Sequence, residues 1–132
     1  PYMLKNIEQY NIVITGRFLQ EDTLEEWPLI RKLITKARHK VIKLLLGIPY
    51  DTSGAFRCYN FTQVKIEDLL MAKDNGYSFF WESLFLLYKK KYTILEIPMK
   101  QPRRIHGSSK ISIKDIFRAV TYLIYFYFKK KF

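Results

Sequence analysis

The chain has 132 residues, the length of one ordinary domain, and 48% of them are hydrophobic. This content excludes a disordered chain and is enough for one packed core. The net charge is +11, with most of the excess in residues 61–132. Such a charge favours an anionic partner: lipid headgroups, nucleic acid or a phosphorylated ligand. The single cysteine, Cys58, excludes an internal disulfide, and the histidine and cysteine spacing is not that of a metal site.

The first elements are a strand and a long helix. Residues 11–16 form a β-branched run typical of a buried strand. A helix is expected over about residues 24–46. Asp22 or Thr23 would cap its start, and Gly47 would end it.

This long helix is amphipathic. Its apolar residues recur at helical spacing: Trp27, Ile30, Ile34, Ala37, Val41, Leu44 and Leu45. Arg31, Thr35 and Arg38 follow one another along a stripe beside that face, and lysines cover the far side. Two interpretations stay open. The helix lies on a membrane or a partner, or its basic side is a solvated face over an ordinary core.

Further along, residues 55–60 and 93–98 are expected strands, and residues 66–73 an expected short helix. A helix over residues 78–91 is dense in aromatic side chains and carries one acid among them, Glu82. We therefore expect an α/β fold in which the segments 11–16, 55–60 and 93–98 join one sheet.

The final helix is expected over about residues 112–130. It begins amphipathic and becomes apolar on all sides from Ala119 to Phe128, a run too short to cross a bilayer. Tyrosines and phenylalanines before three lysines are typical of the membrane interface. A buried C-terminal helix and a truncated transmembrane hairpin remain as alternatives.

A short loop follows the last expected strand and reads Arg103-Arg104-Ile105-His106-Gly107-Ser108-Ser109-Lys110. Cations and main-chain N–H groups bind phosphate, and glycine lets the backbone approach a ligand closely. The loop therefore predicts an anion-binding site.

Four motifs stand in order along the chain: Ile14-Thr15-Gly16-Arg17-Phe18; Asp51-Thr52-Ser53-Gly54-Ala55-Phe56-Arg57; Phe80-Trp81-Glu82; and Glu96-Ile97-Pro98 leading to Arg104 and Gly107-Ser108-Ser109-Lys110. Together they resemble, over residues 2–128, the C-terminal half of family-2 glycosyltransferases of the dolichyl-phosphate mannose synthase type. The resemblance implies a partial nucleotide-sugar-transferase-like mixed sheet with flanking helices. It also implies two amphipathic membrane-interface helices, about 24–46 and 112–130.

The resemblance implies one partial domain over residues 1–132, the acceptor-binding half of an enzyme. The family transfers a sugar from a nucleotide diphosphate sugar to a dolichyl or undecaprenyl phosphate, here expected at the cytoplasmic face of a membrane. A divalent metal, Mg or Mn, is expected for the whole enzyme, with its ligands absent from this chain. The chain has no initiator methionine, so we expect it to be cut from something longer. Because the family's metal motif is absent, we expect no turnover from these 132 residues alone.

The resemblance also assigns roles to residues. Arg17, Arg31 and Thr35 would hold the acceptor phosphate, and Arg104 would close over it. Lys110 would neutralise or anchor the Arg104 loop.

Gly107 would act as the hinge of that loop, with Ser109 supporting it. Asp51 and Arg57 would shape the floor near the sugar as a buried pair. Glu82 would support the site or touch the sugar. Of these residues, Arg104, Asp51 and Lys110 are expected to take part in catalysis.

Two of these residues also have a purely structural interpretation. Arg57 is equally consistent with a strand residue paired with a core acid, and Glu82 with a local salt bridge. The expected partners are a polyprenyl phosphate, a nucleotide sugar, the membrane surface, and a missing N-terminal half or a second copy, but no nucleic acid. A non-catalytic basic module for membrane surfaces or nucleic acid, or an inactive truncated transferase, is the alternative function.

Overall fold

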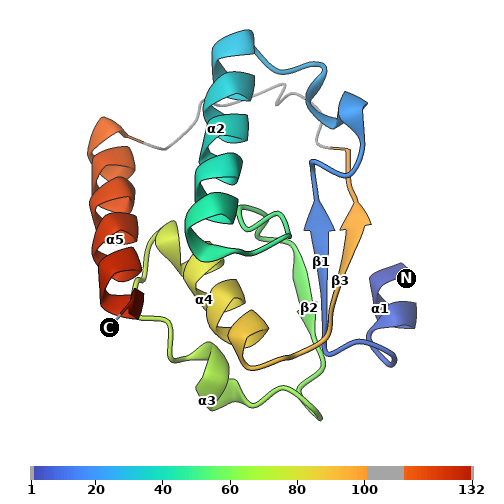
Figure 1. Cartoon of the computed structure of the whole chain (residues 1–132). Coiled ribbons are helices and arrows are strands. Elements are labelled where there is room, and N and C mark those ends of the chain that lie inside the picture. The colour runs from blue at the N-terminus through green and yellow to red at the C-terminus, as the bar shows by residue number, and fades with distance from the viewer. Residues whose placement is uncertain (1, 101–111, 132) are drawn as a thin grey trace.

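The structure, a computed structural model, describes residues 2–100 and 112–131. It is a mixed α/β fold in which helices flank one small sheet (Figure 1). The elements in chain order are α1 (Tyr2–Asn6), β1 (Ile12–Gly16), a 3₁₀ turn η1 (Glu21–Leu24), α2 (Leu29–Leu46), β2 (Arg57–Tyr59), α3 (Ile66–Leu69), α4 (Ser78–Lys89), β3 (Ile94–Pro98) and α5 (Ile113–Lys131).

The sheet has the strand order β2-β1-β3. β1 pairs with β3 in parallel, from Ile12 opposite Ile94 to Gly16 opposite Pro98, and with β2 in antiparallel fashion. The expectation that the three segments join one sheet is confirmed. The carboxyl ends of β1 and β3 and the start of β2 therefore meet at one edge, which in open α/β sheets is where ligands bind.

The core lies between this sheet and α4. Ile12 and Ile14 alternate with Val13 along β1 and so point to one face of the sheet. They pack there in a buried cluster with side chains of α2 and α4, among them Ile42, Leu46, Trp81, Leu84 and Leu87. The cluster explains why the aromatic-rich segment 78–89 is helical, because seven of the twelve residues of α4 are buried.

The start of α2 differs from the expectation. The chain forms the separate turn η1 and reaches the helix only after Pro28, whose extended backbone (φ −54°, ψ 141°) precedes the first helical residue. The expected capping by Asp22 or Thr23 is therefore wrong, and the Thr23 hydroxyl instead donates to the carbonyls of Arg17 and Gln20. Proline disfavours a helical residue before it, which separates the two elements. The predicted end is confirmed, because Gly47 adopts φ 68° and donates its N–H to Lys43 O (2.9 Å).

The surface of α2 is divided in an unusual way. Its apolar stripe faces outward: Ile30 is 73% exposed and Leu44 is 85% exposed, and Leu33, Ile34 and Val41 are exposed as well. The opposite side carries the half-buried Arg31, Thr35 and Arg38, followed by the buried Ile42 and Leu46. The interpretation of a solvated basic face over an ordinary core is therefore wrong for this helix.

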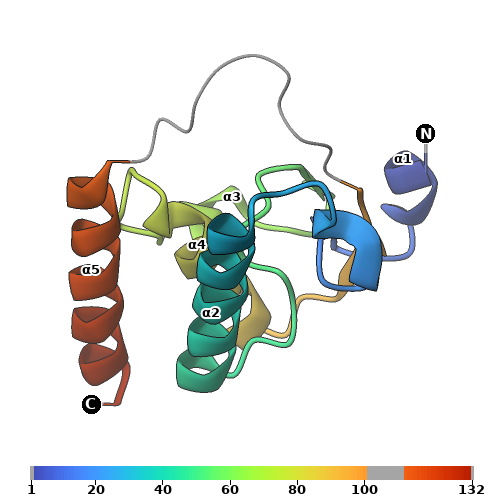
Figure 2. The ribbon, with the colours of Figure 1, turned by 90° about the horizontal axis from the view of Figure 1, so that it is seen from above.

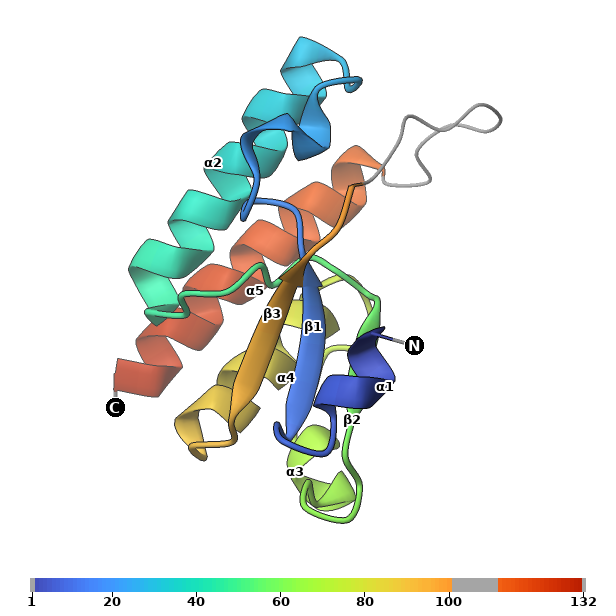
Figure 3. The same ribbon diagram turned by 90° about the vertical axis from the view of Figure 1, so that its right-hand side faces the viewer.

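Helix α5 has two apolar faces. Tyr122, Leu123 and Phe126 pack inward, and the Phe126 ring lies 5.2 Å from the ring of Trp81 (centroid to centroid). The other face is exposed and consists of Ile113, Ile116, Phe117, Val120, Ile124 and Phe128. α2 and α5 run in a similar direction in Figures 1 and 3, and Figure 2 shows them as neighbouring columns. Among the described residues, no helix has the length and apolar character needed to cross a bilayer.

Candidate anion-binding site

Arg17 and Asp51 form the centre of the candidate site. Arg17 directly follows β1, and Asp51 lies in the loop before β2, so the sheet brings both to the same edge. The Nε atom of Arg17 donates to Asp51 Oδ2 at 3.1 Å, and the main-chain N–H of Arg17 donates to the same oxygen at 3.1 Å. Arg17 Nη2 also donates to the hydroxyl of Ser53. The guanidinium is thus held from two sides.

Asp51 is only 2% exposed, and both oxygens of its carboxylate accept hydrogen bonds. Its second oxygen, Oδ1, accepts from the main-chain N–H (3.0 Å) and the hydroxyl (2.5 Å) of Ser53. Burial by itself raises the pKa of Asp51, but the charge of Arg17 and the hydrogen bonds from Ser53 outweigh it, so the pKa is lowered. Asp51 therefore stays ionised and orients Arg17.

Glu96 supports the Asp51 loop from β3. Its Oε1 atom accepts the main-chain N–H of Asp51 at 2.9 Å. The side chain crosses Gly16, where a Cβ atom would lie 2.0 Å from Glu96 Oε1, so only glycine leaves room for it. Burial, with a further contribution from the Asp51 charge, raises the pKa of Glu96 against the opposing hydrogen bond. The sequence motifs contain Glu96 and Gly16, but their link to Asp51 was not predicted.

The ring of Trp27 brings Arg17 and Arg31 together. Trp27 is buried just before α2, and the Cζ atom of Arg31 lies 3.9 Å from the centroid of its ring. The Cζ atom of Arg17 lies 5.7 Å from the same centroid. A guanidinium over an indole is a favourable cation–π contact. The two arginines predicted to share a site thus both lie near the Trp27 ring, and Thr35 is half-buried one turn after Arg31.

Two residues of α2 join this group without having been assigned to it. Burial lowers the pKa of Arg38, the charge of Arg17 lowers it further, and Asp51 opposes the shift. The ring of His39 stacks on Phe18 with 4.2 Å between centroids, and burial lowers its pKa while Asp51 opposes. The spacing of Arg38 from Arg31 and Thr35 is the signal that could have assigned it, whereas His39 had none.

Arg57 has a different role from the one expected. It donates to the carbonyls of Thr52 (3.0 Å), Gly54 (2.9 Å) and Phe80 (2.7 Å), and Nη1 donates to Ser83 Oγ (3.3 Å). The expected pairing of Asp51 with Arg57 is wrong, because Asp51 pairs with Arg17. Main-chain carbonyls of a tight loop are close enough to satisfy the guanidinium, and Arg57 thereby fixes the 51–54 loop against α4.

Glu82 lies away from this group. It is 2% exposed and accepts hydrogen bonds from the main-chain N–H groups of Lys73 and Asp74 (both 3.1 Å) and from the hydroxyl of Tyr122 (3.0 Å). None of these partners is a cation, so the salt-bridge alternative is wrong for the described residues, whereas the expected support of the site or sugar contact stays a prediction. Glu82 instead fastens α5 to the turn before α4.

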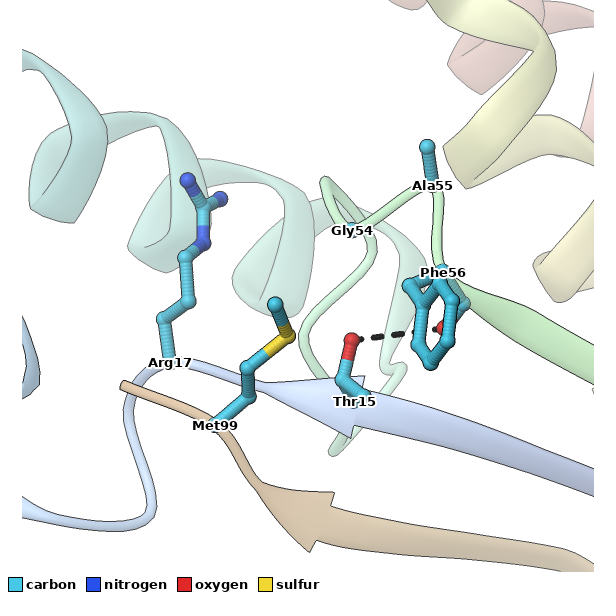
Figure 4. Close-up of a pocket in the computed structure, with 6 residues that line it drawn as sticks. All are labelled: Thr15, Arg17, Gly54, Ala55, Phe56 and Met99. Atoms are coloured by element: carbon cyan, nitrogen blue, oxygen red, sulfur yellow. Dashed lines mark hydrogen bonds between the residues drawn. The ribbon is translucent and has the colours of Figure 1, made fainter. Parts of the chain in front are cut away.

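An open depression of about 290 Å³ adjoins Arg17. In Figure 4, Arg17 and Met99 extend from the ends of neighbouring strands, and Gly54, Ala55 and Phe56 lie across from them. Four predicted site residues, Arg104, Gly107, Ser109 and Lys110, lie outside the described residues. The segment that carries them begins just after Met99 in the sequence.

The described residues do not fit a divalent metal. Within residues 2–100 and 112–131, no three His, Cys, Asp or Glu side chains are grouped as metal ligands. The two carboxylates at the site already accept protein donors, and the guanidinium of Arg17 would repel a cation. The metal expected for the whole enzyme remains a prediction about residues beyond this site.

The fold and the candidate site define an α/β protein with arginine side chains at one edge of its sheet. Over 113 residues the chain is 26% identical to an undecaprenyl-phosphate mannosyltransferase from Micrococcus luteus, a match covering 85% of the chain and 46% of that protein. Over 111 residues it is 24% identical to a polyprenol monophosphomannose synthase from Mycolicibacterium smegmatis, covering 83% and 42%. No protein-family profile and no solved structure matches.

The chain thus spans less than half the length of these relatives. Their similarity to it extends over most of the 132 residues and supports the family indicated by the four motifs. The chain is therefore similar in sequence to polyprenyl-phosphate glycosyltransferases.

Proposed function

We propose that this chain forms the acceptor-phosphate site of a membrane-surface glycosyltransferase. The enzyme would transfer a sugar from a nucleotide diphosphate sugar to a polyprenyl phosphate, and the names of both relatives favour mannose. In this proposal, residues 1–132 are one partial domain that binds the acceptor. The donor site and its Mg or Mn ion would belong to the part of the relatives that the match does not cover.

The main observation behind the proposal is that α2 has an exposed apolar side and a half-buried side with arginines. Its half-buried Arg31 contacts the ring of Trp27, near which Arg17 also lies, while its apolar stripe, from Ile30 to Leu44, faces outward. A lipid phosphate has the same division, with charge at one end and hydrocarbon at the other. An apolar helix face with basic flanks is suited to the headgroup boundary of a membrane. The exposed face of α5 extends the apolar surface, and we place the protein on the cytoplasmic leaflet.

The acceptor phosphate needs orientation more than activation. Its second pKa is about 6, so it is already largely dianionic near neutral pH. Holding it in place and excluding water are then the main tasks. Arg17 and Arg31 suit this work because a planar guanidinium binds phosphate through two hydrogen bonds. Asp51 would orient Arg17, and Arg104 would close over the phosphate. Lys110 would anchor or neutralise the Arg104 loop, with Gly107 as its hinge.

Vesicle binding tests the proposal. The chain is mixed with zwitterionic vesicles that contain either undecaprenyl phosphate or undecaprenol, and the bound fraction is measured by sedimentation. We expect stronger binding to the phosphate vesicles, and Arg31→Ala should remove the difference. Lys36→Gln, which removes an exposed charge from another side of α2, is the matched control. Equal binding to both vesicles, or nucleic-acid binding that Arg31→Ala leaves unchanged, would favour a non-catalytic basic module instead.

A further inference from the structure

Four exposed lysines lie where α4 and α5 end. Lys89 is the last residue of α4 and Lys91 follows it closely, while Lys129 and Lys130 lie in the last turn of α5. We call these four residues the lysine group. In Figure 1 both helices end on the lower side of the molecule, whereas β1 and β3 point upward to the candidate site. β3 begins soon after Lys91 and reaches that site only at its other end, so the lysine group is a separate surface.

The ring of Phe85 holds two of these lysines together. The Nζ atom of Lys130 lies 4.6 Å from the centroid of this ring, and the Nζ atom of Lys89 lies 5.7 Å from it. Phe85 is 4% exposed and packs edge-on against the ring of Phe126, with 5.4 Å between centroids. Each ammonium gains a cation–π contact, yet two like charges from different helices share one ring. Burial lowers the pKa of Lys130, and the charge of Lys89 lowers it further. An anion bound here would offset the repulsion.

No acid of the described residues compensates the lysine group. Within residues 2–100 and 112–131, no ion pair includes any of its four members. Lys90, which lies between two of them in sequence, differs because its Nζ atom lies 2.5 Å from Asp68 Oδ1. The other carboxylate oxygen of Asp68 accepts the hydroxyl of Tyr92 at 2.7 Å, so this acid is already in use. The positive charge of the lysine group is therefore left for a partner.

The backbone at Lys91 is a second observation. Its φ is 67°, a conformation that glycine adopts most readily after a helix. Glycine would be less strained there, and Lys89 in the last turn of α4 would still interact favourably with the helix macrodipole. The end of the helix alone thus does not account for a lysine at this position, whereas a cationic surface does.

The surface beside the lysine group indicates which anion it binds. On α5 the side chains of Ile124 (48% exposed) and Phe128 (57% exposed) come directly before the two lysines. An apolar helix face that ends in lysines is suited to the headgroup region of a bilayer, where the ammonium groups reach lipid phosphates. Single-stranded nucleic acid would instead need open aromatic rings among the cations for base stacking, and the Phe85 ring is buried.

We propose that the lysine group binds the headgroups of anionic phospholipids and forms a second membrane contact, distinct from the acceptor-phosphate site. This inference rests on the proposed function, because both place α5 on a membrane. It adds a preference for negatively charged lipid, which attracts clustered lysines at the membrane surface.

Vesicles without polyprenyl phosphate test the inference. Binding of the 132-residue chain is measured by sedimentation with phosphatidylcholine vesicles and with vesicles in which about one third of the lipid is phosphatidylglycerol. Because a net charge of +11 by itself favours anionic vesicles, two variants of equal charge are compared. Lys89→Gln/Lys130→Gln changes the lysine group, and Lys5→Gln/Lys73→Gln removes two exposed lysines elsewhere.

The two variants should differ clearly. A lysine near an anionic membrane contributes roughly fivefold in affinity. We therefore expect Lys89→Gln/Lys130→Gln to bind phosphatidylglycerol vesicles at least about tenfold more weakly than the wild type, and the control variant to lose less than about threefold. Lys89→Arg/Lys130→Arg keeps both charges and should bind like the wild type. Circular dichroism checks folding, and Lys89→Gln/Lys91→Gln replaces the first variant if that one does not fold.

The outcomes separate this inference from the proposed function. Equal losses in the two glutamine variants would show that only net charge acts and would overturn the inference. Weaker binding of duplex DNA with unchanged vesicle binding would make nucleic acid the partner and overturn it as well. Lys89→Gln/Lys130→Gln should keep the preference for undecaprenyl phosphate over undecaprenol in zwitterionic vesicles; its loss would contradict two distinct contacts. Absence of that preference in the wild type overturns the proposed function, and a wild type that binds no vesicle overturns both.

Discussion

The side chain of Glu96 crosses the backbone of Gly16 to reach the main-chain N–H of Asp51, 2.9 Å from Glu96 Oε1. Three motifs far apart in sequence meet in this one contact. It holds the Asp51 loop against the sheet, and Asp51 in turn holds Arg17. The orientation of the candidate phosphate-binding arginine thus depends on a glycine that lies outside the site.

Gly16→Ala should destabilise the protein by about 1–2 kcal/mol, the usual size of one lost buried hydrogen bond. The added Cβ would displace the Glu96 carboxylate from Asp51, so Glu96→Ala should have a similar effect. Urea unfolding of both single variants and the double variant checks this. Because both changes break the same contact, the double variant should cost little more than either single one. Strict additivity would contradict the account.

Glu96→Gln separates the hydrogen bond from the charge. Its amide oxygen can still accept the Asp51 N–H, and the neutral amide removes a negative charge that burial and Asp51 disfavour. We expect a free energy of unfolding at pH 7.5 equal to or above that of the wild type. A loss as large as that of Glu96→Ala would show that the carboxylate charge itself is needed.

The free energy of unfolding should decrease at low pH because Asp51 becomes protonated. Its folded pKa is lowered, so its contribution is present above the unfolded pKa of about 3.9 and is lost as the pH falls through the folded value. Glu96 acts in the opposite sense, because its folded pKa is raised. Protonated Glu96 stabilises the fold at low pH, and this contribution is lost as the pH rises from about 4.3 through the folded value. Asp51→Asn should cost roughly 2–4 kcal/mol at pH 7 because it leaves Arg17 without its carboxylate. Urea unfolding between pH 2 and 7 should show a shallower acid dependence for Asp51→Asn; an unchanged slope would argue against the ion pair.

The exposed apolar stripe of α2 should contribute to membrane binding but little to the free energy of unfolding. Leu44→Gln should change the free energy of unfolding by no more than about 0.5 kcal/mol, because the side chain is exposed. The same change should weaken binding to vesicles. Ile42→Ala is the matched core variant and should cost about 2–4 kcal/mol. Unchanged vesicle binding by Leu44→Gln would remove α2 from the membrane contact.

Residues 1–132 alone should give no sugar transfer. A mixture of the chain with a nucleotide-linked mannose, undecaprenyl phosphate and Mg²⁺ or Mn²⁺ is expected to yield no mannosyl lipid by mass spectrometry. The physical reason is that the described carboxylates at the site are already occupied by protein donors. Product above that of a protein-free control would contradict this expectation.

Local patterns predicted the parts of the fold that depend on local physics. The β-branched run before Arg17 predicts β1, and Gly47 predicts the end of α2 because glycine adopts positive φ at little cost. The start of α2 was misjudged because capping residues upstream of a proline can serve a separate turn instead.

The site was harder to predict, because its contacts join distant segments. Arg57 carries the right charge to pair with Asp51, yet it donates to nearby main-chain carbonyls instead. The sequence does not show which of these acceptors the guanidinium will bind. The sequence pattern places an apolar stripe on α2 but does not say whether it faces the core or the solvent. Only the packing of Ile42 and Leu46 on the other side decides that.

The central claim is that Arg17 and Arg31 bind one lipid phosphate, and arginine side-chain NMR tests it most directly. In a titration with farnesyl phosphate, the Nε–H signals of both residues should shift together and saturate at one ligand per chain. Arg57, which is held by carbonyls, is the internal reference and should not move. Shifts confined to Arg57 or to surface residues such as Arg118, or none at Arg17 and Arg31, would contradict the account.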